Sequence, residues 1–194
     1  MKKLLLLATM IAMAATALPV TAQGRFSFDL RAAGAAPTSN LAGADLTTGF
    51  GLGATVAIRL QPHLHLYGGW DWFGFSADQS FAGAESDFEE TGYTYGLRFE
   101  HPFGAAMGMN YRLEAGGTFK HIEIENADGD IIGDSEHSVG FELGAGAVLG
   151  ANRSWQIVPM LRFRSLSPEF TIGNVRTDAT LRYVALELGI ARRF

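Results

Sequence analysis

The chain has no cysteine among its 194 residues, so disulfide staples are excluded and stability must come from hydrogen bonds and packing. Basic residues are also scarce, with 15 Lys and Arg against 20 Asp and Glu. Because binding to a phosphate backbone needs clusters of basic residues, we expect no nucleic-acid partner.

Beyond its first segment the chain has no apolar run long enough for a membrane-spanning helix. That first segment has Lys2 and Lys3, an apolar stretch over residues 4–18 and small residues at 20–22. It predicts a cleaved secretory signal over residues 1–22, whereas a transmembrane anchor would need a longer apolar stretch. The mature part, residues 23–194, is then one exported domain with 13 basic and 20 acidic residues, a net charge of −7.

Eight segments of the mature part alternate apolar with small or polar residues, the period of two that predicts β-strands. In one of them Val139, Phe141 and Leu143 alternate with Gly140 and Glu142. The expected strands are residues 25–36, 48–60, 63–75, 91–103, 109–124, 137–149, 154–166 and 181–194. The alternation blurs at residues 121–122, which we interpret as a β-bulge.

The connections between these segments alternate in length. Those at 37–47, 76–90, 125–136 and 167–179 are long and polar, and those at 61–62, 104–108 and 150–153 are short. Short periplasmic turns and longer outer loops are typical of outer-membrane barrels. The sequence therefore predicts an all-β, eight-stranded antiparallel up-and-down transmembrane barrel, with both termini periplasmic. No linker points to a second domain, and we expect no periplasmic peptidoglycan-binding module.

The alternation alone does not say which face points outward, since a lipocalin-like barrel also alternates, with its apolar face inside. An eight-stranded lumen is just wide enough to be filled by side chains. The polar face is rich in glycine, which fits such a crowded interior and accounts for the high count of 24 glycines. Acids and bases are nearly matched on that face, as buried charges require.

We therefore place the apolar face against lipid and predict a lumen network of Asp29, Arg31, Arg59, Asp71, Arg98, Glu100, Arg112, Glu114, Glu142, Arg162, Arg164 and Glu187. This network is expected to plug the lumen; the alternative is a switchable narrow pore.

Aromatic residues gather near both ends of the expected strands, as in the girdles at the two interfaces of a membrane barrel. The predicted girdle residues are Trp70, Trp72, Tyr93 and Tyr95 at the outer ends, and Tyr111 and Trp155 at the inner ends.

The last strand ends the chain on an aromatic residue, in the run Val-Ala-Leu-Glu-Leu-Gly-Ile-Ala-Arg-Arg-Phe at 184–194. With the signal and the alternation, this run resembles the small eight-stranded outer-membrane barrels of Gram-negative bacteria, the OmpA/OmpX-like superfamily. The resemblance implies a monomer in the outer membrane, in contact with lipid and lipopolysaccharide, and a Phe194 that the barrel-assembly machinery reads. Arg192 departs from the pattern, but a long Arg near the membrane edge can reach water.

Two features could carry chemistry. The expected third outer loop is acidic, but it lacks the EF-hand spacing, so we interpret it as a solvated loop, with divalent-cation bridging to lipopolysaccharide phosphates as a weaker alternative. Residues Ser135, Glu136, His137 and Ser138, with His121, could serve a lipid-A-modifying enzyme, but they match no motif. We therefore expect no catalytic site, metal or cofactor, and a structural or adhesive role through the outer loops and an unidentified extracellular ligand. A narrow gated channel and a lipid-A-modifying enzyme remain the alternatives.

Overall fold

The computed structural model describes residues 25–104, 108–172 and 175–194, so the predicted signal peptide lies outside the described residues. Within them, no helix is long and apolar enough to cross a membrane. The described strands are β1 (Phe26–Pro37), β2 (Gly49–Gln61), β3 (Leu64–Ser80), β4 (Gly83–Pro102), β5 (Met109–Glu125), β6 (Ile131–Asp134), β7 (Ser138–Leu149), β8 (Trp155–Leu166), β9 (Glu169–Ile172), β10 (Val175–Asp178) and β11 (Leu181–Arg193).

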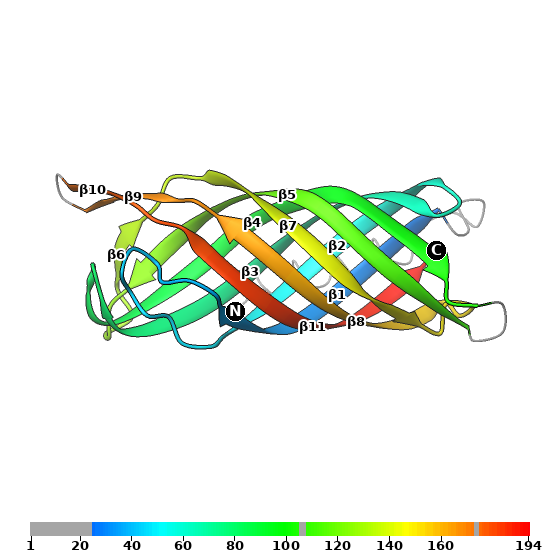
Figure 1. The fold of residues 1–194 in the computed structure, drawn as a ribbon, viewed down its shortest axis with the longest axis horizontal. Helices are drawn as coiled ribbons and strands as arrows, with labels where there is room; N and C mark the ends of the chain where they lie inside the picture. Colours follow the sequence, from blue (N-terminus) through cyan, green and yellow to red (C-terminus); the bar gives the residue numbers. More distant parts are fainter. Residues whose placement is uncertain (1–24, 105–107, 173–174) are drawn as a thin grey trace, which may run out of the picture.

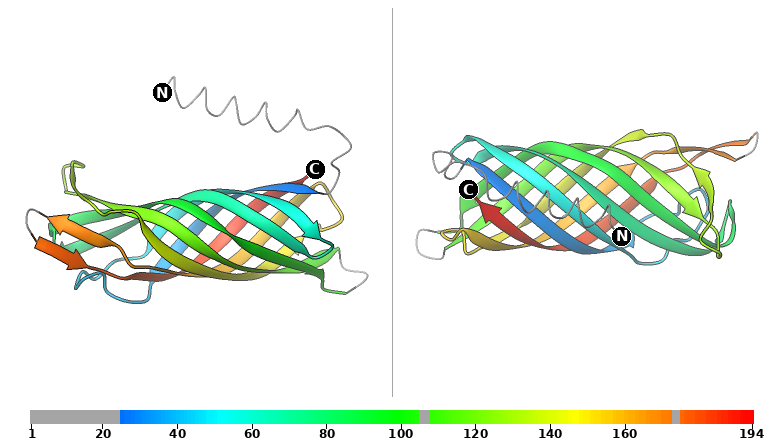
Figure 2. Two further views of the ribbon diagram at one scale, coloured as in Figure 1. Left: turned by 90° about the horizontal axis from the view of Figure 1, so that it is seen from above. Right: turned by 180° about the vertical axis from the view of Figure 1, so that it is seen from behind.

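Eight of these strands form a closed antiparallel barrel, which confirms the predicted fold. The order β4-β3-β2-β1-β11-β8-β7-β5 is closed into a ring by a further pairing between β4 and β5. The short strand β6 pairs with the end of β5, and β9 and β10 form a separate hairpin. This hairpin and the C-terminus lie at opposite ends of the barrel (Figures 1 and 2).

Six barrel strands begin and end within one residue of the predicted limits, and β3 and β4 are the exceptions. The expected loop at 76–90 is wrong: β3 and β4 continue into this segment as paired strands and join at Phe81 and Ala82. The expected bulge at 121–122 is also wrong, because His121 and Ile122 pair in continuous register with Thr91 and Glu90.

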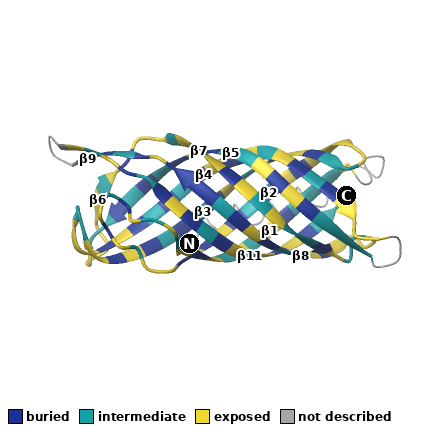
Figure 3. Ribbon diagram, in the orientation of Figure 1, coloured by how far each residue is buried: buried dark blue, intermediate teal, exposed yellow. Residues whose placement is uncertain are grey.

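Both errors have one physical cause, which is a reversal of polarity along the strands. In the middle of the barrel the outward side chains are apolar, and Leu143 and Leu186 are 53% and 68% exposed. Towards the outer end it is the inward side chains that are apolar, among them Phe88 and Ile122, both fully buried. Figure 3 shows buried and exposed residues alternating along the strands, so the period of two is kept. What changes is the medium on the outer face, which is lipid around the middle of the barrel and water towards its outer end.

Candidate functional site

The barrel interior holds a network of buried ion pairs built from inward-facing side chains of seven of the eight barrel strands; of the described residues of β2, none takes part in an ion pair. It joins seven acids to seven bases. The acids are Asp29, Asp71, Glu90, Glu100, Glu114, Glu142 and Glu187, and the bases are Arg31, Arg98, Arg112, Lys120, Arg162, Arg164 and Arg193. The charges are therefore balanced, which is what allows so many ionised groups to be buried together.

Arg162 is a central member of this network, since it donates to three carboxylates from three other strands. Its Nε lies 2.9 Å from Glu187 Oε1, its Nη1 lies 2.8 Å from Glu142 Oε1, and its Nη2 lies 2.7 Å from Glu114 Oε2. Glu142 also accepts hydrogen bonds from Tyr67 and Thr94, both at 2.7 Å. Such multiple, charge-assisted bonds fix each side chain in one position.

Asp71 is the second such centre, and it accepts hydrogen bonds from three bases. Arg31 and Arg164 both donate to its Oδ2 at 2.9 Å, and Lys120 donates to its Oδ1. Lys120 also forms an ion pair with Glu90 at 2.8 Å. All five side chains are at most 8% exposed, so this part of the network is closed to bulk solvent.

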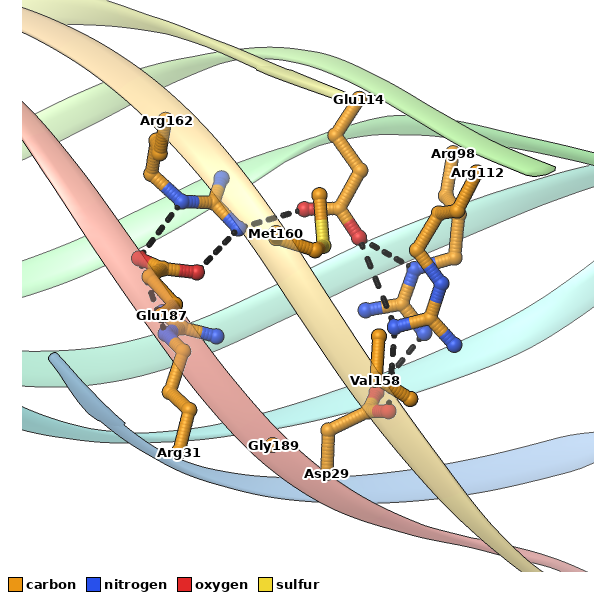
Figure 4. A pocket seen from close by; sticks show the side chains of 10 residues that line it. All are labelled: Asp29, Arg31, Arg98, Arg112, Glu114, Val158, Met160, Arg162, Glu187 and Gly189. Atoms are coloured by element: carbon orange, nitrogen blue, oxygen red, sulfur yellow. Dashed lines mark hydrogen bonds and ion pairs between the residues drawn. The ribbon is translucent and has the colours of Figure 1, made fainter. Parts of the chain in front are cut away.

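Towards the inner end of the barrel Arg98 and Arg112 both bind Asp29 (Figure 4), at 2.7 Å and 3.1 Å. The pocket that these side chains line together with Glu187 has a volume of about 10 Å³. A water molecule needs about 10–15 Å³ by this measure, so the pocket has room for about one.

Eleven of the twelve residues predicted for the network take part in it, and the placement of Arg59 is wrong. Arg59 is exposed near the inner end of β2, where the pairing with β3 shifts register between Arg59 and Gln61. Sequence reasoning missed Glu90, assigned to a loop, Lys120, next to the supposed bulge, and Arg193 at the end of the last strand. Glu90 and Lys120 could have been found by continuing the alternation of β4 and β5 past the point where the polarity reverses.

An apolar cluster fills the lumen at the outer end of this network. Its largest members are Phe73, Phe75, Phe88, Ile122, Ile124, Leu166, Phe170, Leu181 and Tyr183. The first outer loop completes it, since Leu41 and Ala44 pair through their backbones and are fully buried in the cluster. Glycine makes room for these rings: a Cβ at Gly51 would collide with the ring of Phe73.

The predicted girdle residues lie on or near the outer wall. Trp70, Tyr93, Tyr95 and Trp155 are exposed, and Trp70 is the register partner of Tyr93. Trp72 is half-buried, and its Nε1 donates to Glu89 Oε2 at 2.9 Å. At the inner end Tyr111 stacks on His101, with ring centroids 5.6 Å apart. The guanidinium of Arg192 lies over the rings of Trp155 and Phe194, at 5.4 Å and 4.8 Å from their centroids.

The outward face of β4 and β5 is acidic at the outer end. Glu89 and Asp87 pair across the strands with Glu123 and Glu125. The Glu89 carboxylate raises the pKa of Glu125 above its ordinary value, and partial desolvation, Asp87 and Glu123 add to this effect. The acids therefore form a negative patch.

The residues considered for catalysis do not come together as a nucleophile and its base. Ser135 is buried, and its Oγ accepts the backbone N–H of Ile122 at 2.8 Å. His121 instead hydrogen-bonds with His137 and Glu123, both at 3.2 Å.

A closed eight-stranded barrel with an apolar wall and a charged lumen is the architecture of small outer-membrane proteins. A family model described as the outer membrane protein beta-barrel domain matches residues 4–194. The chain belongs to this family.

Solved barrels of Gram-negative outer membranes share the fold of this outer membrane β-barrel protein. Neisserial surface protein A is similar with a TM-score of 0.61 and 17% identity, over 87% of this chain and 97% of that one. OprG from Pseudomonas aeruginosa is similar with a TM-score of 0.63 and 14% identity, over 89% and 96%. Outer membrane protein W of E. coli is similar with a TM-score of 0.59 and 14% identity, over 89% and 98%. No curated protein sequence matches the chain.

This protein is therefore an integral protein of the Gram-negative outer membrane. Its exposed apolar wall is the surface that meets lipid. We expect the strand extensions beyond the wall on the outer side, because the more extended connections of such barrels lie there.

Proposed function

We propose that this outer membrane barrel is closed to transport and that its role is structural or adhesive, carried by the strand extensions at its outer end. The observation that supports this most is the filling of the lumen in two successive layers. The inner layer consists of balanced ion pairs and the outer layer of fully buried apolar side chains, such as Phe73 and Phe88, capped by Leu41. Ions that crossed this barrel would have to displace both layers.

The outer end offers a large and well-ordered surface to a partner. The β3–β4 hairpin, β6 and the β9–β10 hairpin all lie there, so hydrogen-bonded strands replace flexible loop over much of its extent (Figure 1). Ile131 and Ile132 on β6 are 59% and 43% exposed, although β6 lies beyond the wall that meets lipid. Exposed apolar side chains of this kind, rimmed by polar residues, are typical of contact surfaces.

Conductance in planar bilayers tests the closed lumen. We expect the purified wild-type protein to give no discrete conductance steps at any holding voltage, while a porin reconstituted in the same way conducts. The conductance of the Glu142→Ala variant, which lacks a carboxylate in the lumen, is compared with that of Leu143→Ala, a substitution of the neighbouring residue on the lipid face. Regular conductance steps from the wild-type protein would overturn the closed-barrel proposal in favour of the narrow channel.

Cell attachment tests the contact role. Cells that display the protein are compared with cells that lack it for attachment to immobilised matrix proteins and to bare polystyrene. We expect the protein to increase attachment, and the double substitution Ile131→Ser and Ile132→Ser to reduce the increase. Asp128→Asn, in the same outer connection, is the matched control and should attach like wild type. Equal attachment with and without the protein on both surfaces would contradict an adhesive role.

A further inference from the structure

His121, Glu123 and Asp134 form a compact group at the outer end of the barrel, beyond the ring of eight strands. One ligand atom from each lies within 4.8 Å of those of the other two. The pairing of β5 with β7 ends at Lys120, and from there β5 pairs with β6. These three residues therefore lie on the extension that meets water, outside the lipid-facing wall.

The backbone holds this group in place. His121 and Glu123 are two residues apart on β5 and so share its outward face, and Asp134 on β6 is the register partner of Glu123. Two bonds between Ile122 and Ser135 fix the junction: Ser135 N–H donates to Ile122 O at 2.9 Å, and Ile122 N–H donates to Ser135 Oγ at 2.8 Å. The group is thus built on paired strands and not on a mobile loop.

The spacing of the donor atoms suits a small dication. His121 Nε2 and Glu123 Oε1 are 3.2 Å apart. Two ligands about 2.0–2.2 Å from a tetrahedral zinc ion lie about 3.3–3.6 Å apart, so this pair needs little movement to bind one. The side chains of His121 and Glu123 are 17% and 31% exposed, which leaves a path for an ion to enter.

His137 positions the imidazole of His121. His121 Nδ1 lies 3.2 Å from His137 Nε2, and the two rings are 4.5 Å apart. When the His121 proton is on Nδ1 it is donated to His137, and Nε2 is left unprotonated and directed at Glu123. A hydrogen bond to the second nitrogen is the usual way in which a metal-binding histidine is oriented. His137 is itself stacked on Phe119, with ring centroids 4.9 Å apart.

We propose that His121, Glu123 and Asp134 bind a first-row transition-metal dication of the zinc class, with His137 as the positioning residue. Nitrogen from imidazole favours zinc and its neighbours over Ca²⁺ and Mg²⁺, which prefer oxygen ligands alone. Glu89, the other register partner of Glu123, adds negative charge beside the site. The site does not depend on the adhesive role proposed above, since metal binding is measured on the purified barrel.

Calorimetric titration of the untagged, detergent-folded protein with ZnCl₂ tests this site, and CaCl₂ is the comparison. We expect one Zn²⁺ per barrel, bound more tightly than Ca²⁺. His121→Ala and Asp134→Asn should each weaken Zn²⁺ binding by at least about tenfold, because loss of an orienting partner alone typically costs about 10–100-fold in affinity. Asp128→Asn removes an exposed acid from the same connection and should bind Zn²⁺ like wild type. Heat-dependent gel mobility shows that each variant is folded.

Substitution of Co²⁺ for Zn²⁺ separates a positioning role of His137 from a general effect of its removal on the protein. The visible absorption of bound Co²⁺ reports its coordination geometry, and His137→Ala should alter that spectrum while Asp128→Asn leaves it unchanged. Three results overturn the proposal: no Zn²⁺ binding by the wild-type protein, Ca²⁺ bound as tightly as Zn²⁺, or wild-type Zn²⁺ affinity in both His121→Ala and Asp134→Asn.

Discussion

Arg164 on β8 and Asp71 on β3 form a two-point ion pair across the lumen, with Nη1 to Oδ1 at 3.2 Å and Nη2 to Oδ2 at 2.9 Å. In the ring of eight strands, three strands separate β3 from β8 in either direction. The pair therefore joins diametrically opposite walls of the barrel. Bidentate pairing of this kind adds geometric specificity to the energy of the ion pair.

Asp71→Asn should destabilise the barrel, because Asn keeps the size of the side chain and removes its charge. Arg164, Lys120 and Arg31 would then share one carboxylate fewer in a closed interior. Removing one partner of a buried pair typically costs about 3–5 kcal/mol. Urea unfolding in liposomes measures the change, with Asp128→Asn as an exposed control expected within about 0.5 kcal/mol of wild type. If both variants unfold like wild type, the network does not hold the walls together.

Leu143→Arg tests which side of the wall meets lipid. Leu143 lies midway along β7 and is 53% exposed, while Glu142 beside it is fully buried. An Arg on the lipid face near the midplane costs about 2–4 kcal/mol. Ile132→Arg is the matched control, since Ile132 is also apolar and exposed but lies on β6, where water is expected. The assignment of faces is wrong if the two substitutions have equal effects on the free energy of unfolding in bilayers.

Phe88→Ala tests the apolar cluster at the outer end of the lumen. Phe88 is fully buried there, and its ring centroid lies 6.0 Å from that of Phe81. Truncating a buried Phe to Ala costs about 3–5 kcal/mol, because a cavity is left. The control is Val139→Ala on the lipid face, where the side chain is 68% exposed and we expect a much smaller loss. A loss for Phe88→Ala no larger than that for Val139→Ala would mean that the cluster adds no packing energy.

Most of the barrel could be predicted from the sequence because its physical requirements are local. A strand with lipid on one side and a filled lumen on the other must alternate, as Leu143 and Glu142 do. Short turns between consecutive strands then require these strands to pair as antiparallel neighbours. The polarity of the lumen was predictable for the same reason, since charges such as Arg162 and Glu114 occur in balanced numbers on one face.

What could not be predicted depends on contacts across the barrel and on where the membrane ends. No local pattern says that Arg164 meets Asp71, because they lie on strands that are not neighbours. The alternation at His121 and Ile122 looked irregular because the outer face changes from lipid to water near that point. The group of His121, Glu123 and Asp134 also depends on β6, which has only four residues. A strand this short gives too little alternation to be recognised from the sequence.

Phe194→Ala separates a role in assembly from a role in stability. The backbone N–H of Phe194 donates to Phe26 O at 2.9 Å, and an Ala at this position keeps that bond. The ring is half-buried and meets the guanidinium of Arg192, so its loss should cost about 1 kcal/mol or less in the refolded protein.

If the assembly machinery reads the terminal aromatic residue, the amount of folded barrel in the outer membrane should fall several-fold. This fall should be larger than the small change in stability can explain. Phe103→Ala, at an exposed aromatic at the same end, should leave that amount unchanged. A Phe194→Ala protein that reaches the membrane in wild-type amounts would show that the ring is not read, and an equally large loss of stability in vitro would show that it acts as a structural contact instead.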